Sequence, residues 1–282
     1  MPVFIQVTLS MNVMTESAVV MPDVQSSVDQ RRVPIQRVGV RGIRGPMLVA
    51  DASGNPMPTV ADWELTVALP ADKKGTHMSR FMALLEDFRP KAMSPIVFCE
   101  MITKMLPLLD ATQGDITAKF PYFIQKTAPV SGVKSLMDYE LTFKARATQT
   151  NPNNTNVEFE LTVLVPVTSL CPCSKAISEY GAHNQRSHII VNTVFSDPSL
   201  VNIDGLIKTV EQQASCELWG LLKRTDEKYV TEHAYNNPKF VEDLVRDVAV
   251  QVQNVSGVQQ FTVSAENFES IHNHSAYAVV EG

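Results

Sequence analysis

Apolar residues are concentrated in eight segments of the chain, each rich in valine, leucine or isoleucine and bounded by polar turns. This pattern is typical of β-strands. The first two segments flank the turn Ala52–Pro56, which indicates a hairpin, and a turn with Ser131 and Gly132 joins the third to the fourth. The strands are predicted at 36–49, 58–69, 117–126, 134–147, 157–168, 187–195, 258–266 and 275–281.

A helical spacing of apolar residues interrupts the strands twice in each half. Helices are predicted at Ser79–Phe88 and at Ser94–Leu109, where Ser94 and Pro95 form a typical helix start. In the second half, one helix is predicted from about Asp197 to Lys223, and another begins near Asn237 and Pro238. The order strand, strand, helix, helix, strand, strand therefore occurs twice, which predicts an α+β protein of two similar modules.

The polar turn Thr148–Asn156 is the best candidate for a boundary between these modules. We therefore divide the chain into an N-terminal arm at 1–33, a first module at 34–152 and a second module at 153–282. The arm shows no steady period and is expected to be mobile or packed on a partner. Met11 or Met14 is a candidate for the true initiator.

Composition narrows the class of protein. The 282 residues carry a formal net charge of −6, which argues against broad nucleic-acid binding but allows a local basic pocket for a phosphorylated small molecule. The N-terminus lacks the basic and long apolar regions of a signal peptide, and no stretch approaches about 20 consecutive apolar residues. We expect a cytoplasmic protein that binds neither nucleic acid nor membranes.

The four cysteines fall into two kinds. Cys99 and Cys216 lie in apolar, helix-like surroundings and are expected to be buried. Cys171 and Cys173 are surrounded by proline and serine, in a connection between two strands. His183 and His188 follow in the same connection or close to its end, and thiolate with imidazole is a ligand combination that zinc-like metals favour.

The Cys-Pro-Cys spacing is too short for an ordinary structural zinc knuckle, so only one of the two thiols is expected on a metal. Further ligands must come from elsewhere in the chain. Candidates are His272 and His274, which would share a face on a strand, and the acids Glu227 and Glu242. Simpler interpretations stay open: a solvated edge for the histidines, a solvated loop for Glu227 and a boundary charge for Glu242.

Five longer runs resemble type IB GTP cyclohydrolase I, and the resemblance covers nearly the whole chain from about Pro22. They are PDVQSSVDQRRVPIQRVGV, KGTHMSRF, PVTSLCPCSKAISEYGAHNQRSHI, LLKRTDEKYVTEHAYNNPKFVEDLVRDVA and AENFESIHNHSAYA. The resemblance implies two tandem tunnelling-fold modules, which assemble into oligomeric barrels with active sites at module interfaces, and a homotetramer. The implied reaction converts GTP and water to 7,8-dihydroneopterin triphosphate and formate, the first step of tetrahydrofolate and pterin biosynthesis.

The resemblance also implies roles for individual residues. Cys171, His183, His272 and, less directly, Glu227 would hold a divalent metal that activates water, with Cys171 and His183 at the catalytic centre. Glu242 would bind the guanine edge. The metal would be zinc, manganese or ferrous iron. Candidates for the triphosphate and for proton transfer are Arg186, His188, His77 and Arg80, whereas Cys173 would support the site or be structural.

Two other functions stay open at this point. A related tunnelling-fold nitrile reductase would use Cys171 as a nucleophile with NADPH and no metal, although the His183 and His272 candidates then have no purpose. A binding module without enzymatic activity would instead hold a structural metal with four closed ligands.

Overall fold

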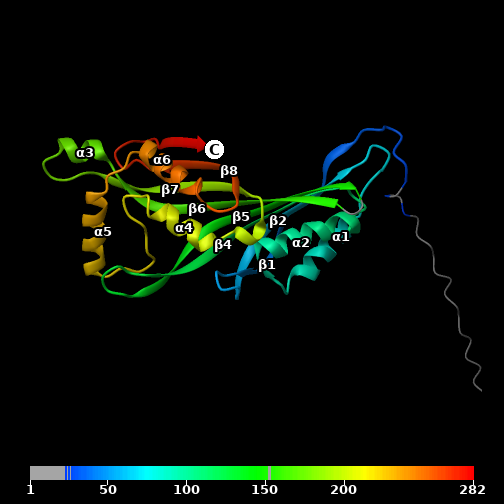
Figure 1. Cartoon of the computed structure of the whole chain (residues 1–282), viewed down its shortest axis with the longest axis horizontal. Coiled ribbons are helices and arrows are strands. Elements are labelled where there is room, and N and C mark those ends of the chain that lie inside the picture. Colours follow the sequence, from blue (N-terminus) through cyan, green and yellow to red (C-terminus); the bar gives the residue numbers. More distant parts are fainter. Residues whose placement is uncertain (1–22, 24, 26, 152–153) are drawn as a thin grey trace, which may run out of the picture.

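Within the residues that the structure describes, 23, 25, 27–151 and 154–282, nine strands form one sheet (Figure 1). The structure, a computed structural model, confirms all eight predicted strands and contains one more, the short β3. The strands are β1 (Ile35–Ala50), β2 (Pro56–Leu69), β3 (Ala92–Met93), β4 (Gln113–Thr127), β5 (Lys134–Asn151), β6 (Asn154–Leu170), β7 (Asn184–Phe195), β8 (Val258–Asn267) and β9 (Ala276–Glu281). Their order is β3-β1-β2-β4-β5-β6-β7-β8-β9, antiparallel except between β1 and β3.

The helices are α1 (Met78–Phe88), α2 (Pro95–Leu108), α3 (Pro172–Ile177), α4 (Ile203–Glu211), α5 (Arg224–Asn236) and α6 (Val241–Val252). Of these, α1, α2, α4 and α6 pack on one face of the sheet. Inward-facing strand residues and the apolar faces of α1, α2, α4 and α6 form one continuous core. The ring of Phe98 on α2 lies 5.6 Å from that of Phe143 and 6.2 Å from that of Phe159, so α2 packs across both halves of the chain. The sheet and helices together confirm the α+β class.

The predicted boundary at 148–156 is a hairpin inside the continuous sheet. β5 and β6 pair from Glu140 opposite Leu164 to Asn151 opposite Asn154. The order of strands and helices does repeat, because helices lie between the second and third long strands of each half. These helices are α1 and α2 in the first half and α4 to α6 in the second. The division into two modules stays a prediction.

The helix predicted from Asp197 to Lys223 is wrong at both ends. A short 3₁₀ turn at Pro198–Leu200 comes first, and α4 ends at Glu211. Beyond α4 the chain leaves the helix because its backbone pairs with β6: Cys216 and Thr168 exchange two hydrogen bonds of 2.8 and 3.3 Å. The apolar stripe was therefore a poor guide to the end of the helix.

The segment around Glu227 is a helix and not the loop that the sequence favoured. α5 begins after Lys223, whose backbone N–H donates to Oδ2 of Asp226 at 2.8 Å in a capping arrangement. Few of its side chains are buried, so the segment lacked the apolar periodicity on which helix prediction depends.

The described part of the predicted arm lies along the chain that precedes α1. Val28 forms an isolated antiparallel bridge with Lys73, and the N–H of Lys74 donates to the carbonyl of Ser27 at 3.1 Å. Residues 1–22, with the candidate initiators Met11 and Met14, lie outside the described residues. Among the described helices, none combines the length and the apolar character that crossing a membrane requires.

Lys126, on β4, is a buried lysine that joins the two halves of the chain. Its Nζ lies 2.8 Å from Glu211 and 2.5 Å from Glu217, and its side chain is 7% exposed. The hydroxyl of Tyr139 donates to the same oxygen of Glu211 at 2.7 Å. Burial raises the pKa of Glu211, whereas Lys126 and Tyr139 favour its ionised form. Lys126 therefore compensates the charge of a carboxylate that is unfavourable to bury.

Lys126→Met is expected to lower the free energy of unfolding by about 3–5 kcal/mol near neutral pH, the usual effect of leaving a buried charge without its partner. A carboxyl group whose pKa is higher in the folded state binds more protons when folded, so its contribution to stability falls as pH rises. Because the variant raises the pKa of Glu211 further, its loss of unfolding free energy relative to the parent protein should be smaller at pH 5.5 than at pH 8. Urea unfolding of both proteins at the two pH values measures this difference.

The matched control is Lys119→Met. Lys119 pairs with Glu140 at 2.7 Å, but the two side chains are 53% and 49% exposed, so this pair contributes less than about 1 kcal/mol. Equal losses of stability in the two variants would contradict the assigned role of Lys126.

Candidate functional site

The connection between β6 and β7, residues 171–183, is here called the cysteine loop. It opens with Cys171 as the N-cap of α3 and with Pro172 in the first turn, where its missing N–H is not needed. The backbone N–H of Ser174 donates to Sγ of Cys171 at 3.5 Å, and the Ser174 hydroxyl donates to the Cys171 carbonyl at 3.1 Å. Cys171 is half-buried and oriented, whereas Cys173 is exposed.

The two ends of the cysteine loop lie side by side. The N–H of Cys171 donates to the carbonyl of His183 at 3.1 Å, and the N–H of His183 donates to the hydroxyl of Ser174 at 3.2 Å. Pairing of β6 with β7 closes the loop at its base, where Leu170 lies opposite Asn184. The structure therefore brings together the backbones of Cys171 and His183, the thiol and imidazole candidates.

The imidazole of His183 is held through one of its nitrogens. Nδ1 lies 3.1 Å from Oε1 of Gln185 and 3.5 Å from Oγ of Ser270. Because an amide oxygen only accepts, this contact favours the tautomer with the hydrogen on Nδ1, which leaves Nε2 as the ring nitrogen available to a metal. Histidines that bind metals usually have such a partner on their other nitrogen. The donor set of Cys171 and His183 thus fits a zinc-like metal.

A buried chain of polar side chains supports this imidazole. Nε2 of Gln185 donates to Ser169 at 3.1 Å, the hydroxyls of Ser169 and Ser187 lie 2.6 Å apart, and Ser187 donates to Asn267 at 2.7 Å. All four side chains are buried. These residues were not identified from the sequence. The available signal was that Gln185 and Ser187 are polar residues at alternate positions of β7 whose side chains face the core.

His272 and His274 lie in the bend between β8 and β9 and not on a strand, so the predicted shared strand face is wrong. Their rings stack with centroids 5.0 Å apart, and both residues are exposed. Ser270, two residues before His272, contacts His183. The structure therefore brings the His272 segment beside the cysteine loop.

The two candidate acids occupy different positions relative to Cys171. Glu242 is exposed on the first turn of α6, and Lys239, just before this helix, donates its N–H to the carbonyl of Leu170 at 3.0 Å. The start of α6 is therefore tied to the residue that precedes Cys171.

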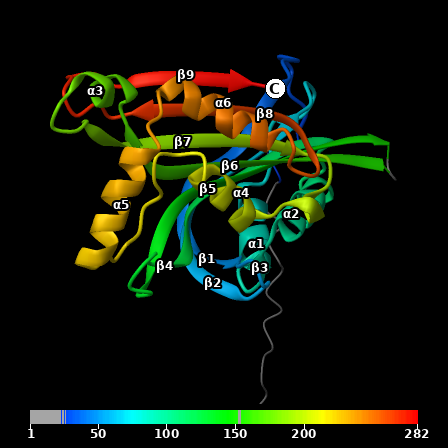
Figure 2. The ribbon, with the colours of Figure 1, turned by 60° about the vertical axis from the view of Figure 1, so that its left-hand side comes forward.

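Glu227 lies at the other end of α5. The carbonyl of Tyr235, near the end of α5, accepts from Lys175 of the cysteine loop. Glu227 is eight residues earlier, about 12 Å along the helix axis. Figure 2 shows the same separation, with α3 near one end of α5 and the β4–β5 turn near the other. One chain therefore does not bring Glu227 to Cys171.

Arg186 and His188 lie on β7, on the face of the sheet that carries no helices. They alternate with the inward-facing Gln185 and Ser187. The His188 ring packs edge-on against Phe268, with centroids 4.8 Å apart. Burial, together with the charge of Arg186, lowers the pKa of His188, which favours neutral imidazole.

His77 and Arg80 belong to the opposite end of the molecule. His77 caps α1 and lies 3.5 Å from Asp23, and Arg80 donates to the carbonyl of Leu108 at 3.0 Å. Figure 1 shows α1 and α3 at opposite ends of the long axis. These two residues can join the cysteine loop only from another copy of the chain.

The part of the chain that the structure describes does not contain a complete metal site. Within the described residues, no group of three His, Cys, Asp or Glu side chains has the geometry to hold an ion. The other cysteines offer no alternative: burial raises the pKa of Cys99 to about 12 and of Cys216 to about 11, which makes both unreactive. Cys216 is buried as predicted, but it lies outside any helix, and Cys99 is only partly buried.

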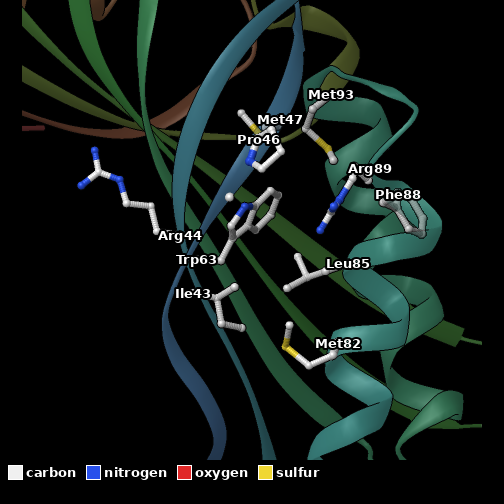
Figure 3. Close-up of a pocket in the computed structure, with 11 residues that line it drawn as sticks. Ile43, Arg44, Pro46, Met47, Trp63, Met82, Leu85, Phe88, Arg89 and Met93 are labelled. Carbon is white, nitrogen blue, oxygen red and sulfur yellow. The ribbon is translucent and has the colours of Figure 1, made fainter.

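An apolar cavity of about 160 Å³ lies far from these residues, between β1 and α1 (Figure 3). Its lining includes Trp63, Met82, Leu85 and Phe88, and the described residues around it include no histidine, cysteine or acid. It has no group that could activate water, so the cysteine loop is the better candidate for chemistry.

Solved structures share this fold. A urate oxidase from Bacillus sp. TB-90 matches with a TM-score of 0.52 at 6% identity, covering 88% of this chain and 99% of that protein. A urate oxidase from Bacillus subtilis matches with a TM-score of 0.51 at 6% identity and covers 88% of this chain and 97% of that protein. At this identity the similarity shows the fold alone.

Sequence comparison is more specific. The GTP cyclohydrolase FolE2 of Bordetella petrii is 65% identical over 272 residues, which covers 96% of this chain and all of that protein. That of Burkholderia multivorans is 56% identical over 267 residues, covering 94% of this chain and 95% of that protein. Residues 21–278 match the family described as "Type I GTP cyclohydrolase folE2". The chain therefore belongs to the type I GTP cyclohydrolase FolE2 family, which confirms the resemblance found in its sequence.

Proposed function

We propose that this protein hydrolyses and rearranges GTP to 7,8-dihydroneopterin triphosphate and formate, the first step of tetrahydrofolate and pterin biosynthesis. Family membership supports the reaction. The observation that carries the site is the backbone hydrogen bond between Cys171 and His183, together with the contact of His183 Nδ1 with Gln185, which leaves Nε2 available to a metal. We place the reaction in the cytoplasm, a prediction that rests on the sequence alone.

Cys171, His183 and His272 would hold a divalent metal, zinc, manganese or ferrous iron, with Glu227 as a further ligand. When bound, such a metal supplies Lewis acidity and an activated water near neutral pH. Gln185 would keep the His183 ring in the tautomer that binds the metal. His188 is neutral near pH 7, because burial lowers its pKa, so it is suited to accept a proton during ring opening and to return it on closure.

Glu242 would bind the guanine edge, because one carboxylate accepts hydrogen bonds from both N1–H and the exocyclic amine. Arg186 offers an exposed positive charge to the triphosphate from the same strand as His188. His77 and Arg80 would add to the phosphate site from another copy of the chain.

An oligomer of tandem tunnelling-fold modules would complete this site. The helix-free face of the sheet exposes apolar side chains, among them Ile190, Tyr277 and Val279. β9 is the last strand of the sheet, and none of the other described strands pairs with its outer edge. Barrels built from several modules, in a homotetramer, would cover both features and bring Glu227, His77 and Arg80 to the cysteine loop of a neighbouring copy.

The test is incubation of the protein with GTP and Zn²⁺, Mn²⁺ or Fe²⁺, followed by oxidation and detection of pterin fluorescence. We expect a fluorescent product. A chelator should abolish its formation without changing the circular dichroism spectrum of the protein, and added metal should restore it. Activity on a nitrile with NADPH and none on GTP would overturn the proposal in favour of a nitrile reductase. Unfolding on chelation would instead indicate a structural metal.

A further inference from the structure

The turn between β4 and β5, residues 128–133, is bound to the first turn of α5 by one side chain. Asp226 is fully buried and accepts from the backbone N–H groups of Val130 at 2.9 Å and Ser131 at 2.8 Å. The Ser131 hydroxyl donates to its second oxygen at 2.5 Å, and Lys223 N–H donates to that oxygen at 2.8 Å. Three of these four hydrogen bonds therefore come from the first half of the chain.

The turn that Asp226 binds is itself well defined. The N–H of Ala128 donates to Val133 at 2.9 Å, and the N–H of Gly132 donates back to Ala128 at 3.2 Å. Gly132 has a φ of 71°, a conformation that glycine adopts without strain. The turn is thus a fixed anchor for α5.

The chain that leads into α5 is fastened to the same hairpin. Nε1 of Trp219 donates to the carbonyl of Thr127 at 3.1 Å, and Glu217 pairs with Lys126. The backbone N–H of Glu227 donates to Lys223 at 2.9 Å, inside the turn that Asp226 caps. These contacts hold the backbone of Glu227 against the β4–β5 hairpin, while its side chain is exposed.

Capping a helix does not require so many contacts. α6 has the same capping arrangement, in which Asp243 accepts from the backbone N–H of Phe240 at 3.1 Å. Asp243 is only partly buried, however, and among the described residues it makes no hydrogen bond to another element. Asp226 does more than begin a helix, because it fixes where that helix begins relative to a distant hairpin.

We infer that Asp226 is a positioning residue, which holds Glu227 where it completes the metal site. This inference rests on the proposed role of Glu227 as a ligand. The first turn of a helix frays when its end is free, and a metal ligand must be held to within about 0.5 Å of its required position. Asp226 and Ser131 together supply that constraint from the hairpin of the first half.

The test is the affinity of the full-length protein for Zn²⁺ alone, measured by competition with a chromophoric chelator. Asp226→Asn is expected to weaken binding by about 10- to 100-fold, as changes to residues that orient metal ligands do. Ser131→Ala, which leaves the helix cap intact, should weaken binding by a smaller factor. Asp243→Asn is the control with the same chemistry at α6 and should keep the affinity of the parent protein. Circular dichroism checks that each variant is folded.

Glu227→Ala separates the inference from the proposal beneath it. We expect this variant to weaken Zn²⁺ binding, and Asp226→Asn to add nothing in its background. If Glu227→Ala weakens binding while Asp226→Asn and Ser131→Ala do not, only the positioning role is overturned. If Glu227→Ala leaves the affinity unchanged, its role as a ligand fails and the inference with it. Should Asp226→Asn not fold, Ser131→Ala decides the matter alone.

Discussion

Cys171→Ala is expected to reduce turnover of GTP to the detection limit of the assay, a loss of more than about 100-fold, because it removes the thiolate that holds the metal. The fold should be retained, since Sγ of Cys171 accepts a weak hydrogen bond of 3.5 Å from Ser174 and the residue is only half-buried. Pterin fluorescence measures activity, and metal analysis after dialysis measures bound Zn²⁺. We expect both to be lost together.

Cys173→Ala is the control, because it removes an exposed thiol two residues away. It should keep both activity and bound metal. A Cys171→Ala protein that turns over GTP at the parent rate would refute the assigned role. A variant that loses activity but keeps the full metal content would remove Cys171 from the metal ligands and point to a nucleophilic role for its thiol.

Glu242→Gln is expected to lower kcat/KM for GTP by about 10²- to 10⁴-fold. Two hydrogen bonds to a charged group are worth about 1.5–3 kcal/mol each, and an amide presents one donor where guanine needs an acceptor. Because Glu242 is exposed at the start of α6, the change should not affect folding. Steady-state kinetics with GTP and with ITP, which lacks the exocyclic amine, measures the effect.

The comparison of the two nucleotides is the sharper part of this test. The parent enzyme should favour GTP strongly over ITP, and the variant should lose most of that preference. Zn²⁺ affinity should stay unchanged, since Glu242 is not a proposed ligand. Glu100→Gln, an exposed glutamate on α2, is the control and should behave as the parent protein. An undiminished preference for GTP in Glu242→Gln would remove Glu242 from guanine recognition.

The strands were predictable because their pattern reflects burial on one face. Leu141, Phe143 and Ala145 alternate with exposed or half-buried residues along β5, and the same alternation runs through β6 and β7. Local composition is enough to recognise such segments. It also identified α1, α2 and α6, each of which buries an apolar stripe against the sheet.

Helices without a strong apolar stripe were not predictable in this way. α5 buries little of its surface and is held at its start by Asp226, whose partners lie in a hairpin about a hundred residues earlier in the chain. α4 ends at Glu211 because the following residues pair with β6, although the apolar spacing continues. Contacts between distant segments determined both boundaries, and a local pattern does not contain them.

The same distinction between local pattern and distant contacts applies to the candidate site. The sequence by itself determined that Cys171 and His183 lie in one connection between two strands, because both belong to the same short segment. Only the tertiary structure decided that Gln185 orients the imidazole, that Ser270 brings the His272 segment alongside, and that one chain separates Glu227, His77 and Arg80 from Cys171. The reason is physical: residues close in sequence meet through local backbone geometry, whereas distant residues meet only where the packing of the whole sheet brings them.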